Sequence, residues 1–435
     1  MRNIVKSVLR FLAVKTLERY SPKVIGITGS VGKTTAKEAV FAVLNRKFWT
    51  RTNEENFNNE IGTPMTILGI KPGGSNFGIA LQILKSFLLA YGIGINKYPE
   101  VLVLELAADR PGDIKYLADM VKPQVGIITA IGEVPVHVSF YANPQAVAKE
   151  KAKLIEALPS DGLAILNFDD QTVLDLKEKT KAKVVTFGFS NQADVWISDI
   201  SYFLSDDNKK IGGLSFKLNQ ANAFIPARVN SFVGVHQLYG VLAAATVGGH
   251  LGINLVEIAG ALENMKLPHG RMNLLRGIKN TIIIDDTYNA SPLAVHAALD
   301  TLNDFAKAAQ QAGMPNVRKV AILADMKELG RYEVDAHRGV GNFAAERTDV
   351  LITVGTAAKL MADSASNQMK SENIFSFDTY KELNEKMQEI IKEGDLILVK
   401  GSQSMRMEKV VKEIMAEPEK ARDLLCRQYG VWLKS

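Results

Sequence analysis

The sequence of 435 residues is poor in cysteine, because Cys426 is its only one. A single cysteine excludes an intramolecular disulfide and any metal site that is built from several cysteines. It also suits a reducing compartment. We therefore expect a cytoplasmic protein.

A strong charge of one sign is missing as well. Lys and Arg number 52 against 47 Asp and Glu, which gives a formal net charge of +5. No long block of Lys and Arg with interleaved aromatic residues occurs, so nucleic acid is not expected as a partner. The weak positive balance suits an enzyme with anionic substrates, and we expect a monomer.

Clean apolar runs of membrane-spanning length are also lacking. The stretch 77–95, "FGIALQILKSFLLAYGIGI", is interrupted by Lys85 and Ser86 and predicts a buried or interfacial helix. The first residues, "MRNIVKSVLRFLAVKTLERY", are basic and amphipathic without a cleavage site, so they predict a helix and not a signal peptide. These two segments leave open a weak, peripheral contact with a membrane.

No internal repeat or low-complexity tract is found, and apolar β-branched runs instead alternate with helical patterns along most of the chain. This alternation is typical of parallel α/β sheets. Residues 191–232 differ, since short alternating stretches punctuated by turn residues predict a small antiparallel insertion. The predicted parallel strands are 24–28, 101–105, 125–129, 163–167, 184–187, 281–285, 320–324, 350–354 and 396–399.

The stretch "VIGITGSVGKTTAKEAV" near the start predicts a phosphate-binding loop (P-loop) between a strand and a helix. The strict pattern requires a glycine where Ile27 stands, so a literal match fails. Gly29 and Gly32 still let backbone N–H groups approach phosphate oxygens, and a helix that begins near Lys33 directs its positive end at the anion. The alternative is an ordinary strand, turn and helix. The predicted nucleotide contacts are Gly29, Ser30, Val31, Gly32, Lys33, Thr34 and Thr35.

The variant loop TGSVGKTT resembles that of the Mur ligases, the ATP-dependent amide-forming enzymes of peptidoglycan synthesis. Other blocks follow in the order of the branch that adds D-alanyl-D-alanine, and the resemblance covers residues 23–413. These blocks are "ENFNNEIGTP", "LVLELAADRPGDIKYL", "PVHVSF", "LPHGRM", "IIDDTYNASP", "LADMKELG" and "LVKGSQSMRMEKVV".

The resemblance implies a ligase that forms an amide through an acyl phosphate, with ATP and Mg²⁺ as cofactors. The acid would be a muramoyl-peptide or another small molecule, and the amine a dipeptide such as D-Ala-D-Ala. Two alternatives stay open: a Mur-like ligase with a polymeric or lipid-linked substrate, and a nucleotide-binding scaffold without catalysis.

Metal and catalytic roles follow from the same resemblance. Glu105 ends an apolar strand and would bind Mg²⁺ beside Thr34. Lys151 matches the lysine that becomes carbamylated in the family, with Lys149 as the competing position; by the residues alone it would be a solvated helix lysine. The implied catalytic residues are Lys33, His137, Lys151 and Lys400, and the implied metal ligands are Thr34, Glu105, His137 and Lys151.

Substrate contacts are expected on both sides of the active site. By resemblance, Arg271 reaches the nucleotide phosphates, Asp286 accepts hydrogen bonds from the ribose, and Lys400 supplies positive charge at the acyl phosphate. The remaining implied substrate-binding residues are Asn58, Asn59, Tyr288, Asn289 and Ser402.

The sequence departs from the family in three places. Gln237 and Gly240 stand where asparagines usually contact adenine in the family, so the resemblance does not carry over those contacts. Gln403 replaces a frequent arginine. Only about two dozen residues precede the loop, so the resemblance implies that the usual UDP-binding domain is not part of this sequence.

From these patterns we predict an α/β protein. An N-terminal helix would span residues 1–22. A P-loop central domain with a mostly parallel sheet and a small antiparallel insertion would span residues 23–295. A C-terminal Rossmann-like α/β domain would span residues 296–435.

Overall fold

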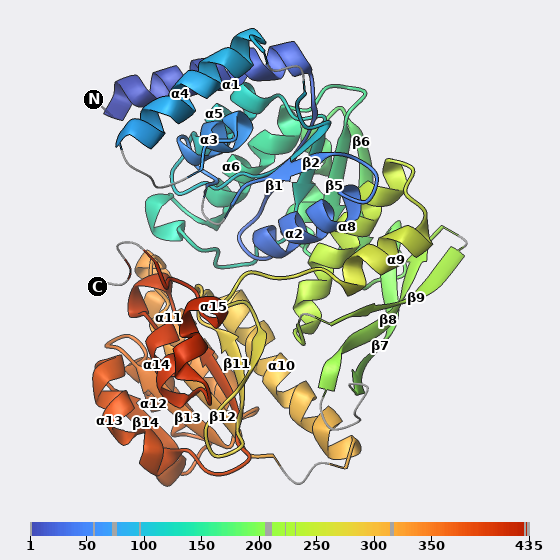
Figure 1. Ribbon diagram of the computed structural model, residues 1–435. Helices are drawn as coiled ribbons and strands as arrows, with labels where there is room; N and C mark the ends of the chain where they lie inside the picture. Colours follow the sequence, from blue (N-terminus) through green and yellow to red (C-terminus); the bar gives the residue numbers. More distant parts are fainter. Residues whose placement is uncertain are drawn as a thin grey trace.

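Two halves, each built around one sheet, make up the computed structural model of the chain (Figure 1). The predicted stretches 55–64 and 77–95 reach onto residues 55, 56 and 95, which lie outside the described residues. The structure describes residues 2–54, 57–71, 76–94, 97–204, 211–221, 223–230, 232–313, 317–429 and 432.

The first sheet has nine strands in the described part of the chain. In spatial order they are β2 (Thr50–Thr52), β3 (Val101–Glu105), β1 (Lys23–Thr28), β4 (Val125–Ile128), β5 (Leu163–Asn167), β6 (Lys183–Gly188), β7 (Val195–Leu204), β8 (Ile211–Gln220) and β9 (Ala223–Val229). Neighbouring strands are parallel from β2 to β7 and antiparallel from β7 to β9. The predicted antiparallel insertion is thus confirmed, and it extends the edge of the parallel sheet.

Helices cover both faces of the first sheet. They are α1 (Arg2–Tyr20), α2 (Lys33–Leu44), α3 (Gly62–Leu68), α4 (Asn76–Tyr91), α5 (Asp113–Val121), α6 (Pro144–Glu156), α7 (Gln171–Leu174), α8 (Leu238–His250) and α9 (Leu255–Glu263). Ile25 and Ile27 of β1 pack with α2, α8 and α9, whereas Val24 packs with α1 and α5 on the opposite face. Burial on both faces explains why β1 is a continuous apolar run.

The second sheet has six strands among the described residues. In spatial order they are β10 (Asn273–Arg276), β11 (Ile282–Asp286), β15 (Leu396–Lys400), β12 (Lys319–Ala324), β13 (Val350–Val354) and β14 (Ile374–Phe377). All pairs are parallel except β10 with β11. Its helices are α10 (Pro292–Gln311), α11 (Glu333–Ala345), α12 (Lys359–Ala365), α13 (Tyr380–Ile390), α14 (Glu408–Ile414) and α15 (Ala421–Leu424).

All nine predicted parallel strands are confirmed, within one or two residues at their ends. The strands that the sequence did not reveal are β2, β10 and β14. Each has only three or four residues, and none is fully buried along its length. Such short, half-buried strands carry too weak a pattern to be recognised.

The domain boundary predicted from the sequence lies between residues 295 and 296. Helix α10 runs across that point, and β10 and β11 precede it although they pair within the second sheet. We propose that the division between the domains follows this change of sheet, between α9 and β10.

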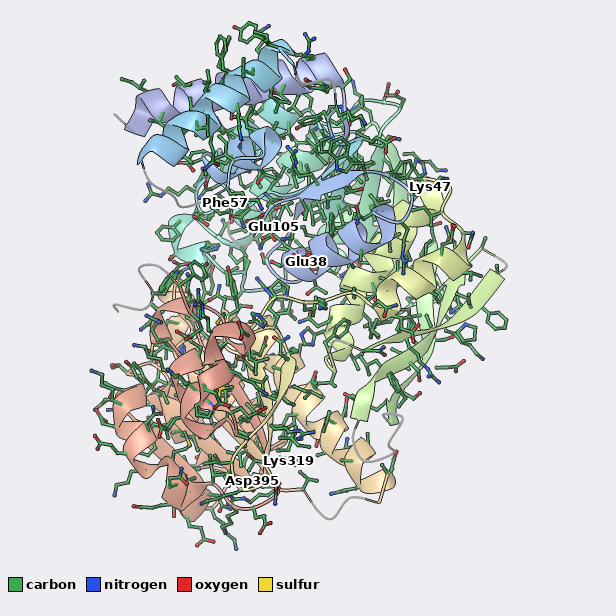
Figure 2. All side chains as sticks on the ribbon, viewed as in Figure 1. Glu38, Lys47, Phe57, Glu105, Lys319 and Asp395 are labelled. Atoms are coloured by element: carbon green, nitrogen blue, oxygen red, sulfur yellow. The ribbon has the colours of Figure 1, made fainter. Side chains whose placement is uncertain are left out.

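The parallel strands of both sheets direct their carboxyl ends toward the space between the halves. Glu105, at the end of β3, lies near this space in Figure 2, whereas Lys319 and Asp395, beside the amino ends of β12 and β15, lie at the remote end of the second sheet. Open α/β sheets bind ligands at the carboxyl ends of their strands. Within the described ranges, no helix is long and apolar enough to cross a bilayer.

Candidate active site

A cavity of about 490 Å³ lies between the two halves. The first half contributes the P-loop and the end of β3, and the second half contributes the ends of β11 and β15. Of the predicted site residues, the following line it: Ser30, Val31, Gly32, Lys33, Thr34, Thr35, Asn58, Asn59, Glu105, His137, Arg271, Asp286, Tyr288, Asn289 and Lys400. Gly29, Lys151 and Ser402 are not in its lining.

The P-loop turn depends on its glycines. Gly29 has a φ of 151° and Gly32 a φ of 85°, which are conformations that side chains with a Cβ rarely adopt. A Cβ on Gly29 would lie 2.1 Å from the Oγ1 atom of Thr129. The Nζ atom of Lys33 donates to the carbonyl oxygens of Gly29, at 2.9 Å, and Ser30, at 3.4 Å. The lysine therefore lies over its own loop, at the start of α2.

The pKa of Lys33 is lowered, and burial is the main cause. The Glu105 carboxylate opposes this effect and the Arg271 guanidinium adds to it. Two cations at the rim of one cavity repel each other, and an anion between them would relieve that repulsion. The arrangement favours a phosphate as ligand.

Glu105 is held by hydrogen bonds on all sides and is 3% exposed. The Oγ1 atom of Thr34 donates to Glu105 Oε2 at 2.9 Å, and the Nδ2 atom of Asn58 donates to Oε1 at 3.0 Å. No group of three or more His, Cys, Asp or Glu residues that could hold a metal occurs in the described part of the chain. The pair Thr34 and Glu105 nevertheless suits Mg²⁺, which takes one or two protein ligands and completes its shell with water and phosphate oxygens.

Asn53 also supports Glu105, although no motif in the sequence predicts this role. It is 1% exposed. Its Oδ1 atom accepts the backbone N–H of Glu105 at 2.7 Å, and its own carbonyl accepts Lys37 Nζ at 2.7 Å. Asn53 therefore holds the backbone of Glu105 in place.

Lys151 lies on α6 and is only 2% exposed, whereas Lys149 on the same helix is exposed. Burial lowers the pKa of Lys151 to about 7, and the Lys33 charge adds to the effect while Glu150 opposes it. Among the described residues, no hydrogen bond or ion pair forms on Lys151 Nζ. A substantial fraction of the Lys151 amines is therefore neutral near pH 7.

His137 connects the two halves. Its backbone is left-handed, with a φ of 65°, and its Nδ1 atom lies 2.5 Å from Glu328 Oε2. Its Nε2 atom lies 3.6 Å from Asp109 Oδ1. The hydrogen bond from His137 lowers the pKa of Glu328. No hydrogen-bond contact between His137 and Lys151 occurs among the described residues, and their predicted partnership stays a prediction.

Lys400 and Asp286 face each other at the ends of neighbouring strands. The Nζ atom of Lys400 donates to Asp286 Oδ2 at 2.5 Å and to the carbonyl of Asn289 at 2.9 Å. Both side chains are buried. The lysine predicted to serve the acyl phosphate and the acid predicted to hold the ribose thus pair with each other here, so a ligand that engages either one competes with this pair.

Arg271 offers a guanidinium to the cavity. Its charge lies over the ring of Tyr288, 4.1 Å from the centroid. Its Nε atom is buried without a hydrogen-bond partner in the described residues. A buried, unsatisfied donor of this kind suits an anionic ligand, which a guanidinium can clamp with two hydrogen bonds.

Local contacts explain why residues 237 and 240 differ from the asparagines that are usual in the Mur ligases. The Oε1 atom of Gln237 accepts a hydrogen bond from the hydroxyl of Thr35. A Cβ on Gly240 would lie 2.7 Å from Thr35 Cγ2 and 2.8 Å from the backbone nitrogen of Ala36. Helix α8 therefore approaches α2 too closely for an asparagine at position 240.

Three further predicted residues have structural partners. Ser402 is 4% exposed and its Oγ atom accepts the backbone N–H of Lys327 at 2.8 Å, which joins two loops of the second half. Asn59 Oδ1 accepts the N–H of Gly62 at 2.9 Å, at the start of α3. Asn289 Oδ1 accepts the N–H of the next residue. Their proposed contacts with substrate stay predictions.

Comparison with known proteins identifies relatives along almost the whole chain. The family model of the Mur ligase middle domain matches residues 27–248, and that of the Mur ligase glutamate ligase domain matches residues 270–403. The UDP-N-acetylmuramoyl-tripeptide–D-alanyl-D-alanine ligase of Bacillus subtilis is 28% identical over 414 residues, which cover 94% of this chain and 79% of the relative. The corresponding ligase of Synechocystis is 28% identical over 403 residues, or 92% of this chain and 76% of the relative.

Solved structures agree with these relatives. The MurF ligase of Thermotoga maritima in complex with ADP superimposes with a TM-score of 0.76 at 25% identity. The superposition covers 95% of this chain and 84% of that one.

Proposed function

The chain belongs to the Mur ligase family, and we propose that it joins the carboxylate of a muramoyl-peptide to the amine of D-Ala-D-Ala, with conversion of ATP to ADP and phosphate. The proposal rests above all on one observation. The P-loop, the Thr34–Glu105 pair and Arg271 meet in one cavity between the halves. This arrangement suits a triphosphate with Mg²⁺.

The residues of the cavity have separate tasks in this reaction. Moving a phosphoryl group onto a carboxylate requires positioning and neutralisation of charge more than covalent help from the protein. Lys33 and Arg271 supply positive charge, and Glu105 with Thr34 would hold the metal. Lys400, once released from Asp286, supplies a cation on the side of the second half. Enclosure between the halves keeps water away from the activated acid.

We extend the proposal to a carbamate on Lys151. In this modification the amine nitrogen attacks the carbon of CO₂, the N–C bond forms and a proton leaves. The step requires the neutral amine, and a pKa of about 7 leaves roughly half of the Lys151 side chains neutral at pH 7. The product would be a carboxylate-like group whose negative charge is complementary to the nearby Lys33 charge.

The activity is tested by measuring ADP release with a panel of acids and amines. We expect release to require both UDP-N-acetylmuramoyl-tripeptide and D-Ala-D-Ala, and mass spectrometry of the product should show the amide. The dipeptide L-Ala-L-Ala is the matched control for the amine. Polymeric and lipid-linked peptides belong in the panel as alternative acids.

Two results would count against the proposal in different ways. ADP release with a different acid or amine would keep the ligase and replace its substrate. Absence of release with every pair, although ATP binds, would favour a nucleotide-binding scaffold.

We also propose that α1 and α4 make weak contact with an anionic membrane surface. The two helices pack against each other at the end of the first half that is remote from the second (Figure 1). Their outer faces expose Ile4, Val5, Val8 and Phe11 of α1 and Leu81, Ile83, Leu84, Phe87 and Tyr91 of α4. The two helices carry more basic than acidic residues. Basic, apolar helix faces are typical of interfacial binding.

The double variant Phe11→Glu/Leu84→Glu tests this contact. We expect the wild-type chain to sediment with phosphatidylglycerol-containing vesicles at low salt, less so with phosphatidylcholine vesicles, and the double variant to stay in the supernatant. Phe224→Glu/Val256→Glu is the matched control, because both residues are exposed and lie elsewhere on the first half. The membrane contact would be contradicted if the two double variants sedimented equally. It would also be contradicted if the wild-type chain did not sediment with the vesicles.

A further inference from the structure

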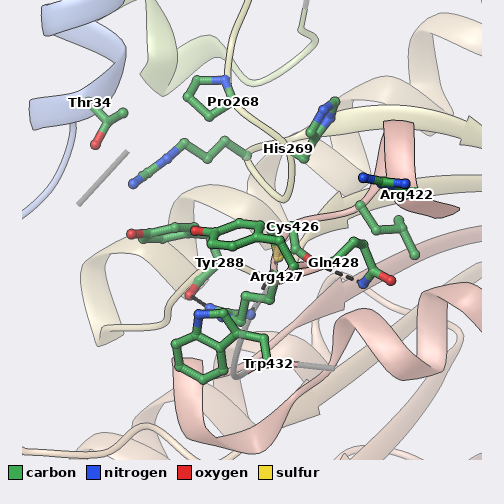
Figure 3. Close-up of a pocket in the computed structure, with 12 residues that line it drawn as sticks. Thr34, Pro268, His269, Tyr288, Arg422, Cys426, Arg427, Gln428 and Trp432 are labelled. Atoms are coloured by element: carbon green, nitrogen blue, oxygen red, sulfur yellow. Dashed lines mark hydrogen bonds between the residues drawn. The ribbon is translucent and has the colours of Figure 1, made fainter. Parts of the chain in front are cut away.

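A second cavity of about 380 Å³ adjoins the active-site cavity. Thr34, Arg271 and Tyr288 line both, so the two spaces meet at the P-loop helix. Figure 3 shows Thr34 and Pro268 on one side of this second cavity and Arg427 and Trp432 on the other, with Tyr288 between them. A ligand whose phosphates lie at the P-loop could therefore extend into it.

One wall of the second cavity comes from the end of the chain. The matched family domain ends at residue 403, and the cavity lining beyond it belongs to α15 and the residues that follow. These lining residues are Arg422, Leu425, Cys426, Arg427, Gln428, Tyr429 and Trp432. The wall is therefore made by a segment outside the family match.

Hydrogen bonds anchor this segment to the loop that follows β11. Arg427 Nη1 donates to Glu408 Oε2 at 2.9 Å and to the carbonyl of Thr287 at 3.2 Å, and Nη2 donates to the carbonyl of Tyr288. Arg427 is 5% exposed and Glu408 is fully buried. Buried charge pairs with further hydrogen bonds hold their geometry, since separating them leaves an uncompensated charge. The wall is thus fixed to the backbone of Tyr288.

The chemistry of the second cavity suits a flat aromatic group attached to an anion. Its described lining contains three aromatic rings, from Tyr288, Tyr429 and Trp432, and no carboxylate. Arg271 stands at its junction with the P-loop cavity. Aromatic side chains bind nucleobases by stacking, which every base permits through its π-face.

On the α8 side of the P-loop helix, the two positions that would contact a base have other partners. Gln237 is engaged by the Thr35 hydroxyl, and Gly240 is packed against the backbone of α2. The active-site cavity also reaches Gln237, but the second cavity has more Phe, Tyr and Trp rings in its described lining. We propose that the described carboxyl-terminal residues, 418–429 and 432, bind the base of the nucleotide, with Trp432 and Tyr429 as stacking residues. This inference rests on the proposed function, because it assumes that a nucleoside triphosphate occupies the P-loop.

The variants Trp432→Ala and Tyr429→Ala test the inference through nucleotide kinetics. We expect the KM for ATP to rise about 10-fold or more in each, with kcat at saturating ATP changed much less, since loss of a stacked ring weakens base binding. Inorganic tripolyphosphate, which lacks a base, should compete with ATP equally well in wild type and variants. Trp432→Phe keeps a ring and should recover most of the affinity.

Trp49→Ala is the matched control, because Trp49 is half-exposed and lines a different pocket of the first half. An unchanged KM in both alanine variants, with normal melting temperatures, would overturn the inference while leaving the ligase intact. Equal weakening of ATP and tripolyphosphate would also overturn it, since the segment would then act on the phosphates or on folding. Failure of the wild-type chain to bind ATP would instead overturn the proposed function.

Discussion

Lys151→Ala is expected to lose ligase activity by roughly 100- to 1,000-fold, the range for removing one preorganised charge from a closed active site. The side chain is buried, and the lowered pKa leaves a substantial fraction of its amine neutral, and so able to react with CO₂, near pH 7. Once carbamylated, it places a negative group beside Lys33, and alanine removes that group. ADP release with saturating substrates measures the loss.

Three observations separate the carbamate from a plain structural role for Lys151. Short carboxylic acids, added at millimolar concentration, should restore part of the activity of Lys151→Ala because they replace the lost carboxylate. Lys149→Ala, one exposed residue two positions earlier, should behave like wild type. Because the pKa is lowered to about 7, the neutral amine prevails above that pH, so reactivation at a fixed concentration of dissolved CO₂ should be faster at pH 8 than at pH 6. Full activity of Lys151→Ala would contradict the assignment.

Glu105→Gln is expected to reduce ligation by roughly 100-fold or more, because the amide keeps the shape of the side chain but cannot neutralise a divalent cation. The amide can still accept a hydrogen bond from Thr34, so folding should be retained. The Mg²⁺ concentration for half-maximal activity should rise, which a titration of activity against Mg²⁺ would show.

The control for this variant lies at the opposite end of the same strand. Glu100, just before β3, is exposed and accepts the backbone N–H of Trp49. Glu100→Gln should leave the Mg²⁺ dependence unchanged. If Glu105→Gln has the Mg²⁺ dependence of wild type, then the carboxylate acts only through Thr34 and Asn58, and the metal must be held by other groups.

Local signals explain which parts of this site could be predicted. The P-loop was recognisable because its chemistry is contained in eight consecutive residues between a buried strand and a helix. Glu105 and Asp286 were recognisable because an acid at the end of an apolar strand is conspicuous. Lys151 is the opposite case. Its spacing within α6 predicts a solvated lysine, and only the resemblance indicated a special one.

Contacts between distant segments could not be predicted. Nothing near Asn53 in the sequence reveals that it supports Glu105, 52 residues away. The pairing of Lys400 with Asp286 depends on the register of β11 against β15, over a separation of 114 residues. The cavity wall formed by the carboxyl-terminal segment depends on the hydrogen bond between Arg427 and Glu408. This contact arises from tertiary packing. These features belong to the fold as a whole and have no short pattern.

The direction of the strands has a consequence for how such a protein can diversify. The parallel strands of both sheets end at the same space, so the groups that face it stand on strand ends, on loops and at the start of α2, while the two hydrophobic cores lie behind them. Lengthening or replacing a loop at this edge alters what is recognised without disturbing either core. New acids or amines could therefore be adopted through changes in a few connecting segments, while the P-loop and the Thr34–Glu105 pair stay as they are.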